Sequence, residues 1–157
     1  MSEVLSIIPD YDVTDENSRK LLGERGEALA VKHLIEKGYR IVVTNFKVPV
    51  GRNSKGVSVT GEIDIIALDG ETLCFIEVKT RRSKDFIAIS RNVDIHKQRQ
   101  ISRTAKIYRR IFNIENLNIR FDVVTVLIPK HSTIEIEHKR AFWNESSFNK
   151  KRWMIPF

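Results

Sequence analysis

The sequence contains a single cysteine, and none of its apolar runs reaches the roughly 20 residues that a membrane-spanning helix requires. One cysteine cannot form an internal disulfide, and Cys74 lies in an apolar segment where a small buried side chain is expected. The opening residues lack the basic flank and the long apolar stretch of a secretion signal. These absences predict a cytoplasmic protein without a membrane partner.

The sequence also lacks the short motifs of several enzyme classes. It has no P-loop, no dinucleotide-binding glycine fingerprint and no nucleophile elbow. The histidines have no zinc-like spacing, and we interpret them as ordinary surface or core residues: His33, His96, His131 and His138. None of the corresponding chemistries is indicated.

Acidic residues are in the minority. The chain has 27 Lys and Arg against 20 Asp and Glu, which gives a formal net charge of +7. Residues 79–110 contain eleven basic residues and only two acidic ones, Asp85 and Asp94. Such clustering favours a nucleic-acid partner, because neutralising phosphates releases counterions, although a solvated surface gives the same pattern.

The length of 157 residues fits one domain. We expect an acidic N-terminal extension at 1–16, a single domain at 17–143 and a basic, aromatic tail at 144–157. Periodicity and turn signals predict helices at 17–37 and 94–112, strands at 39–48, 62–68, 73–80, 119–128 and 133–137, and a polar loop at 49–61. This order predicts an α/β fold with a mixed β-sheet core flanked by helices.

Helical spacing sorts the residues of both helices into faces. In the first helix, Gly23, Glu27, Ala30 and Leu34 share a face of mostly small residues, which would draw Glu27 toward the interior. In the second helix the basic residues Arg99, Arg103, Lys106 and Arg110 lie opposite the apolar residues Ile101, Ala105, Tyr108 and Phe112. The basic face is the expected contact for phosphates.

Two acids and a lysine lie on neighbouring strands. Glu77 and Lys79 share a strand face, because strand side chains alternate. A four-residue hairpin loop at 69–72 places Asp64 opposite Glu77, and a two-residue loop leaves the two carboxylates diagonal. Either register keeps them on one face.

Two carboxylates so close repel each other unless a cation lies between them. Mg²⁺ fits this role, since it binds oxygen ligands and retains waters. Lys79 would then stabilise the developing phosphate charge, with Glu27 as an outer carboxylate. The alternative is a plain ion pair on a polar strand face.

The sequence resembles the YraN-like family of predicted endonucleases, a branch of the restriction-endonuclease-like PD-(D/E)-x-K superfamily. The matching residues are Gly23, Gly26, Glu27, Ala30, Leu34, Gly38, Tyr39, Asn45, 61–67, 75–81, Lys97, Ala105, Tyr108 and 120–124. The resemblance covers roughly residues 20 to 143.

The resemblance implies a restriction-endonuclease-like fold and a set of site residues. Asp64, Glu77 and the Val78 carbonyl would hold Mg²⁺ or Mn²⁺, Lys79 would be the catalytic lysine, and Glu27 would complete the site. The basic residues assigned to nucleic-acid binding are Arg81, Arg82, Lys97, Arg99, Arg103, Lys106 and Arg110.

The expected function is Mg²⁺-dependent hydrolysis of DNA phosphodiester bonds. Three alternatives stay open: a nuclease for branched DNA, since the layout is similar to archaeal-type Holliday junction resolvases, a non-catalytic nucleic-acid-binding adaptor, and a basic structural module. The resolvases work as dimers, so a homodimer stays open as well.

Overall fold

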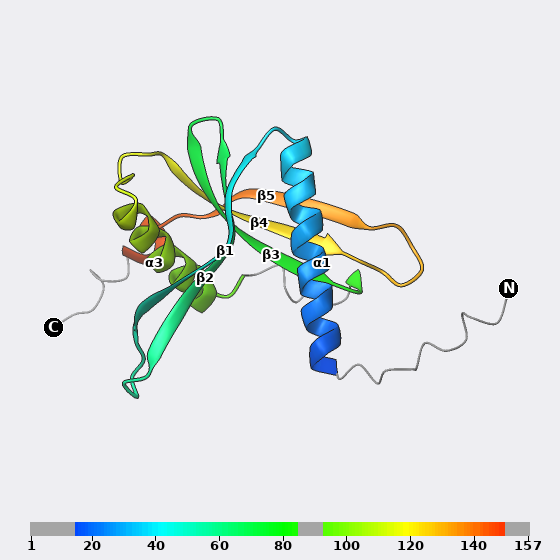
Figure 1. Cartoon of the computed structure of the whole chain (residues 1–157), viewed down its shortest axis with the longest axis horizontal. Helices are drawn as coiled ribbons and strands as arrows, with labels where there is room; N and C mark the ends of the chain where they lie inside the picture. The colour runs from blue at the N-terminus through cyan, green and yellow to red at the C-terminus, as the bar shows by residue number, and fades with distance from the viewer. Residues whose placement is uncertain (1–14, 85–92, 150–157) are drawn as a thin grey trace, which may run out of the picture.

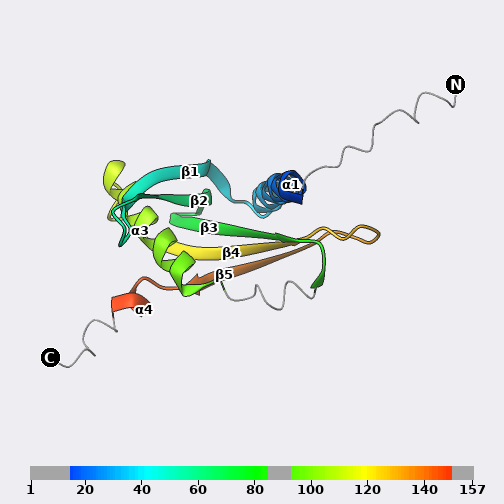
Figure 2. The ribbon, with the colours of Figure 1, turned by 90° about the horizontal axis from the view of Figure 1, so that it is seen from below.

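The computed structural model describes residues 15–84 and 93–149, in which two long helices pack on opposite faces of a five-stranded sheet (Figures 1 and 2). The elements are α1 (Asp15–Glu36), β1 (Arg40–Arg52), β2 (Ser58–Asp69), β3 (Thr72–Arg81), α3 (Ile95–Ile111), β4 (Ile119–Leu127), β5 (Glu135–Trp143) and the short α4 (Ser146–Asn149). No helix in these two ranges is both long and apolar enough to cross a membrane. The mixed sheet flanked by helices confirms the predicted α/β fold class.

The strands lie in the order β1-β2-β3-β4-β5, with β3 and β4 parallel and the other neighbouring pairs antiparallel. The parallel pair follows from the chain path, because parallel strands need a crossover connection and α3 lies in it. α3 packs mainly on β2 and β1, whereas α1 packs on β3, β1 and β4. Each face of the sheet is therefore covered by one helix.

The β2–β3 hairpin has the predicted pairing of Leu68 with Leu73, but the predicted four-residue loop at 69–72 is wrong, because Asp69 pairs with Thr72 and only residues 70–71 connect the strands in the same register. Gly70, at φ +59°, provides the left-handed conformation that the tight turn needs. The paired residues of this ladder end at Ile65–Ile76, whereas β2 continues to pair with β1 as far as Ser58. The distal halves of β1 and β2 therefore form a two-stranded arm that leaves the sheet (Figure 1).

The predicted polar loop at 49–61 is wrong, since β1 runs on to Arg52 and β2 begins at Ser58. Pro49 is compatible with a strand here because β1 is an edge strand. Only residues 53–57 form the connection, in which the Asn53 side chain accepts the N–H groups of Lys55 and Val57 at 3.0 Å each. The polar side chains had concealed the strand pattern.

The second half of the chain follows the prediction more closely. Asp94 caps α3 by accepting the His96 N–H at 3.2 Å, and Ile101, Ala105 and Tyr108 are buried. The four basic residues of the opposite face are all exposed, as expected. Phe112 departs from the prediction: it is 54% exposed, beyond the end of α3, although its ring lies 4.7 Å from that of Tyr108.

The strand expected at 133–137 pairs with β4, but it extends to Trp143, which is buried and donates its indole N–H to Ser102 Oγ at 2.9 Å. Trp143 is therefore a core residue, while Trp153 lies outside the described residues. Most of the expected N-terminal extension and residues 150–157 of the tail also lie outside them.

A buried charged network holds β4 and β5 together where their register shifts. Asp122 is fully buried and accepts hydrogen bonds from Arg120, from His138 Nε2 at 2.9 Å and from the Ala141 N–H at 3.0 Å. Arg120 also reaches Asp69 at 2.9 Å, so the network extends to the end of β2. The acid that interrupts an otherwise apolar strand is thus fully paired.

α1 approaches the sheet through Gly26, Ala30 and Leu34, which are all buried. A Cβ added at Gly26 would overlap the Thr80 side chain, so only glycine allows this approach. Gly23 and Glu27 lie at the margin of the contact. The helix thereby passes close to the end of β3 that carries Lys79.

These contacts predict opposite effects for two Gly→Ala substitutions on one helix. Gly23→Ala should stabilise the protein by about 1 kcal/mol, because alanine favours the helix and no atom lies within 4 Å of the new methyl group. Gly26→Ala should destabilise it by about 1–3 kcal/mol, because the methyl group overlaps Thr80. Urea unfolding measures both changes, and a stabilising Gly26→Ala would contradict the close packing of α1.

Candidate active site

The point where β2 and β3 separate is marked by a side chain. Asp64 Oδ2 accepts the backbone N–H of Val78 at 2.8 Å, one step beyond the last ladder pair, Ile65–Ile76. Continuing that register by one residue places Asp64 opposite Glu77, which is the first of the two predicted arrangements. The Asp64 carboxylate takes the place of the β2 backbone carbonyl that would otherwise accept this N–H of β3. The hydrogen bond also holds the carboxylate beside Glu77.

Glu77 is 4% exposed and uses its two oxygens very differently. Oε1 lies 3.3 Å from Lys79 Nζ and 3.9 Å from Lys97 Nζ. Oε2 is buried and has no hydrogen-bond partner among the described residues. A protonated Glu77 can share a hydrogen bond with Asp64, whereas the ionised carboxylate has no donor at this oxygen, so the oxygen is available to a cation once the proton is lost.

The surroundings of Glu77 oppose its ionisation. Burial, followed by the negative charge of Asp64, raises the pKa of Glu77 to about 7. Lys97 and Lys79 lower this pKa, but they do not offset burial and the charge of Asp64, and a side-chain hydrogen bond with Asp64 raises the pKa further. The pair of acids thus lacks sufficient positive charge at its centre, which is the condition that a bound cation would relieve.

Glu27 on α1 belongs to the same electrostatic group. Partial burial raises its pKa first, and the charge of Asp64 raises it further, whereas a hydrogen bond with Asn45 lowers it. The described residues contain no group of three or more His, Cys, Asp or Glu side chains placed to hold a metal. The assignment of Glu27 as a further ligand therefore stays a prediction.

Two carboxylates are nevertheless a sufficient protein contribution for Mg²⁺, which is usually bound by one or two carboxylates and keeps several waters. Asp64 and Glu77 meet that requirement, and Glu77 Oε2 is a buried oxygen without a hydrogen-bond partner among the described residues. The Val78 N–H is occupied by Asp64, and its carbonyl stays the predicted third ligand.

Asn45 is a site residue to which the sequence reasoning gave no role. It lies on β1 between the pairs Thr44–Ile65 and Phe46–Ile63, which places it opposite Asp64. Its φ of +54° is left-handed, a conformation in which asparagine is enriched. The available signal was an asparagine inside a predicted strand, where this residue is disfavoured.

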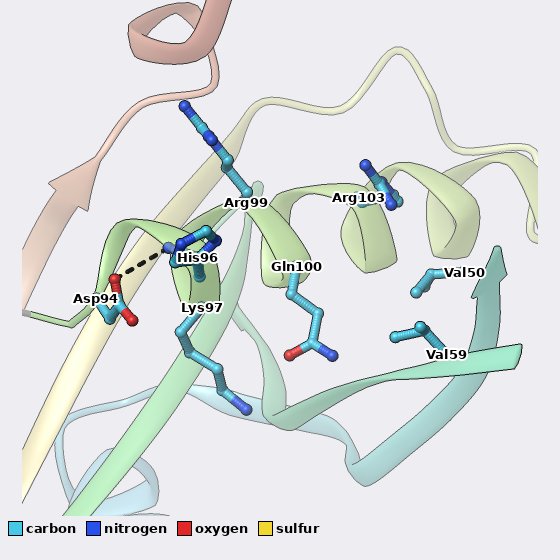
Figure 3. Close-up of a pocket in the computed structure, with 8 residues that line it drawn as sticks. All are labelled: Val50, Val59, Asp94, His96, Lys97, Arg99, Gln100 and Arg103. Carbon is cyan, nitrogen blue, oxygen red and sulfur yellow. Dashed lines mark hydrogen bonds between the residues drawn. The ribbon is translucent and has the colours of Figure 1, made fainter. Parts of the chain in front are cut away.

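The basic residues predicted to bind nucleic acid fall into three groups. Arg81 and Arg82 line a cavity of about 570 Å³ beside α1, together with Glu27 and Lys79. Lys97, Arg99 and Arg103 line a second cavity of about 580 Å³ along α3 (Figure 3). Lys106 and Arg110 are exposed farther along α3 and line neither cavity.

Lys97 has a more specific position than the sequence suggested. It lines the cavity along α3, and its ammonium also contacts Glu77. Lys79 contacts the same oxygen and lines the cavity beside α1. The acidic pair therefore lies between two cavities with basic linings.

The raised pKa of Glu77 predicts a pH dependence of stability for the metal-free protein. Because the folded state holds this proton more tightly than the unfolded state, its stabilising effect is complete below the usual pKa of 4.5 and is lost as the pH rises through about 7. Stability in EDTA should fall over this window by at most ~1.4 kcal/mol per pH unit, and Glu77→Gln should flatten the profile. Urea unfolding at several pH values measures both slopes, and parallel slopes would mean that Glu77 titrates normally.

Comparison with known proteins identifies the family. Residues 26–126 match the model described as "Uncharacterised protein family UPF0102". A UPF0102 protein of Geotalea daltonii is 42% identical over 128 residues, covering 81% of this chain and 93% of that protein. A UPF0102 protein of Chlorobaculum tepidum is 43% identical over 130 residues, covering 80% and 93%.

A solved structure titled "Crystal structure of SSO0001" is similar with a TM-score of 0.36 and 17% identity, covering 86% of this chain and 58% of that one. That likeness is too distant to bear on activity. The match to the family model and the identity to relatives of which 93% is covered are sufficient: the chain belongs to the uncharacterised protein family UPF0102.

Proposed function

We propose that the protein is a Mg²⁺-dependent nuclease that hydrolyses DNA phosphodiester bonds, as the resemblance to restriction-endonuclease-like enzymes implies. The observation that carries this proposal is the buried acidic pair, in which Glu77 keeps an oxygen without a described partner beside Asp64. A stable fold gains nothing from placing two carboxylates together in its interior. A divalent cation bound between the carboxylates would offset their repulsion, which explains why they lie together.

Asp64, Glu77 and the Val78 carbonyl would hold the cation. When bound, Mg²⁺ would stabilise the negative charge that develops on the phosphate. The hydrogen bond from the Val78 N–H fixes the Asp64 carboxylate in advance, so little reorganisation is needed on binding. Glu27, hydrogen-bonded with Asn45, would orient water at the side facing α1.

Lys79 supplies positive charge from the protein itself. Its Nζ lies 3.3 Å from Glu77 Oε1, which holds the ammonium at the edge of the acidic pair. In the reaction the oxygen of a water molecule forms a bond to phosphorus while the bond to the leaving sugar oxygen breaks. The attacking water loses a proton to solvent, and the leaving oxygen gains one. Lys79 stabilises the negative charge of the phosphate in the transition state.

A structural ion pair is the alternative that the contact between Lys79 and Glu77 supports. In that interpretation both lysines would serve only to neutralise a buried acid. Their placement fits this poorly, because both contact Oε1 and leave Oε2 without a described partner. The two interpretations differ in what binds at Glu77, and the experiments below separate them.

The first experiment measures metal binding. Mn²⁺ should raise the melting temperature of the wild type by several degrees, because it binds only the folded site. Asp64→Asn should abolish that shift and keep the fold, since the amide oxygen can still accept the Val78 N–H. Glu62→Gln is the matched control, because Glu62 lies two residues away and pairs with the exposed Lys47. An undiminished shift in Asp64→Asn would refute the ligand assignment.

The second experiment measures chemistry. Lys79→Met keeps most of the aliphatic side chain and removes the charge, so single-turnover cleavage should fall by about a hundredfold or more. DNA affinity in Ca²⁺ should change only a few-fold, because the lysine acts mainly in the transition state.

Lys47→Met is the matched control for Lys79→Met, since it breaks another Lys–Glu contact, at 3.8 Å and away from the acidic pair. It should cleave as the wild type does. Equal cleavage by Lys79→Met would show that Lys79 is not catalytic. A wild type that cuts none of supercoiled, single-stranded, flapped and four-way DNA would favour a binding adaptor.

A further inference from the structure

The cavity along α3 has two chemically different walls (Figure 3). One wall is α3, from which Lys97 and Gln100 point toward the β1–β2 arm, with Arg103 one turn beyond Gln100. The other wall is the arm itself, where Val50 and Val59 face the helix. The cavity is thus polar and basic on one side and apolar on the other.

The two walls are held at a fixed separation. Gln100 Nε2 donates to the Thr60 carbonyl at 3.1 Å and so ties α3 to β2. A Cβ added at Gly61 would overlap Thr104 and Val50, so the base of the arm lies directly against the helix. The cavity is therefore a built groove and not a gap between independent segments.

The basic side of the groove has a net positive charge. Lys97, Arg99 and Arg103 line it against a single acid, Asp94, whose carboxylate is already hydrogen-bonded to the His96 N–H at the start of α3. Arg99 points away from the arm, with its guanidinium 5.7 Å from the centre of the Phe148 ring. Lys97 and Arg103 are thus the cations that the groove offers to an anionic chain.

We propose that this groove holds a single-stranded segment of nucleic acid, with its phosphates along α3 and its bases against Val50 and Val59. A single strand has one charged edge and exposed apolar base faces, which matches the two walls. A duplex carries phosphates on both edges and hides its base faces by stacking. It therefore offers no base face to an apolar wall.

The dimensions agree with this occupant. Lys97 and Arg103 are six residues apart, or about 9 Å along a helix axis, so the two cations can contact phosphates of one short segment of strand. A volume of about 580 Å³ is within the range of sites that hold a ligand of small-molecule size, such as part of one strand.

Lys97 connects the groove to the acidic pair, since it lines the groove and contacts Glu77 Oε1 at 3.9 Å. A strand bound in the groove would exit from the groove next to Asp64 and Glu77. The inference deepens the proposed nuclease function and rests on it for the fate of the strand: the bond that is cut would adjoin an unpaired segment, as in a flap, a gap or a free single strand.

Binding of a fluorescent oligonucleotide tests the groove, measured by anisotropy in Ca²⁺ with the strand free and in a blunt duplex. The wild type should bind the free strand at least about tenfold more tightly. Val59→Glu places a negative charge on the apolar wall and should weaken single-strand binding about tenfold. Val57→Glu adds the same charge to the same arm at a 58% exposed position outside the groove, and should change affinity less than about twofold.

A second variant keeps the test decisive if Val59→Glu unfolds. Arg103→Gln should weaken single-strand binding several-fold and lower the slope of log K against log salt by about 0.7. Arg25→Gln removes one charge from α1, on the other face of the sheet, and should change the slope less. Repeating the series with RNA of the same sequence shows whether the groove distinguishes the sugar.

Equal or tighter binding of the duplex would overturn the proposal, as would equal effects of Val59→Glu and Val57→Glu. These outcomes are distinct from failure of the nuclease proposal, because no binding measurement depends on cleavage. Selective single-strand binding without cleavage would leave the groove intact as a binding site and remove the enzyme. If duplex DNA is cleaved and the groove variants do not affect that cleavage, the nuclease proposal stands and the groove proposal fails.

Discussion

The hydrogen bond from the Val78 N–H to Asp64 Oδ2 determines how the two halves of the sheet separate. A backbone carbonyl in that place would extend the β2–β3 ladder and keep the arm in the sheet. A side-chain oxygen instead ends the ladder and directs β2 away with β1. The same contact lies beside Glu77, where the arm that forms one wall of the groove leaves the sheet, so the site and its surroundings meet at this point.

The acidic pair is a locally unfavourable arrangement inside a fold that is otherwise well matched to its charges. Asp122 shows the contrast: it is also buried, but its oxygens accept hydrogen bonds from Arg120, His138 and the Ala141 N–H. Glu77 has two lysines on one oxygen and no described partner on the other. Conflicts of this kind concentrate where a protein binds or reacts, because elsewhere selection for stability removes them.

The parts of the fold set by local periodicity were predictable from the sequence. Strand alternation and the expected pairing of Leu68 with Leu73 gave the facing positions of Asp64 and Glu77, although the loop has two residues and not four, and helical spacing gave the exposed basic face of α3. The superfamily assignment and the metal stay predictions. Contacts between distant segments were not predictable, because they depend on how the layers dock: Lys97 reaches Glu77 only once α3 has packed on the sheet. The arm was missed because polar residues and Pro49 concealed the distal halves of β1 and β2.

The short separation of the two acids along the chain has a consequence for the order in which the molecule assembles. Asp64 and Glu77 meet within a single hairpin, whereas β3 and β4 pair only after the chain has crossed over through α3. Contacts between nearby residues form early in folding, and parallel pairing across a long connection forms late. The electrostatic repulsion at the centre therefore arises within a local hairpin, and part of the positive charge that offsets it comes from Lys97, on a helix that must dock from a more distant segment.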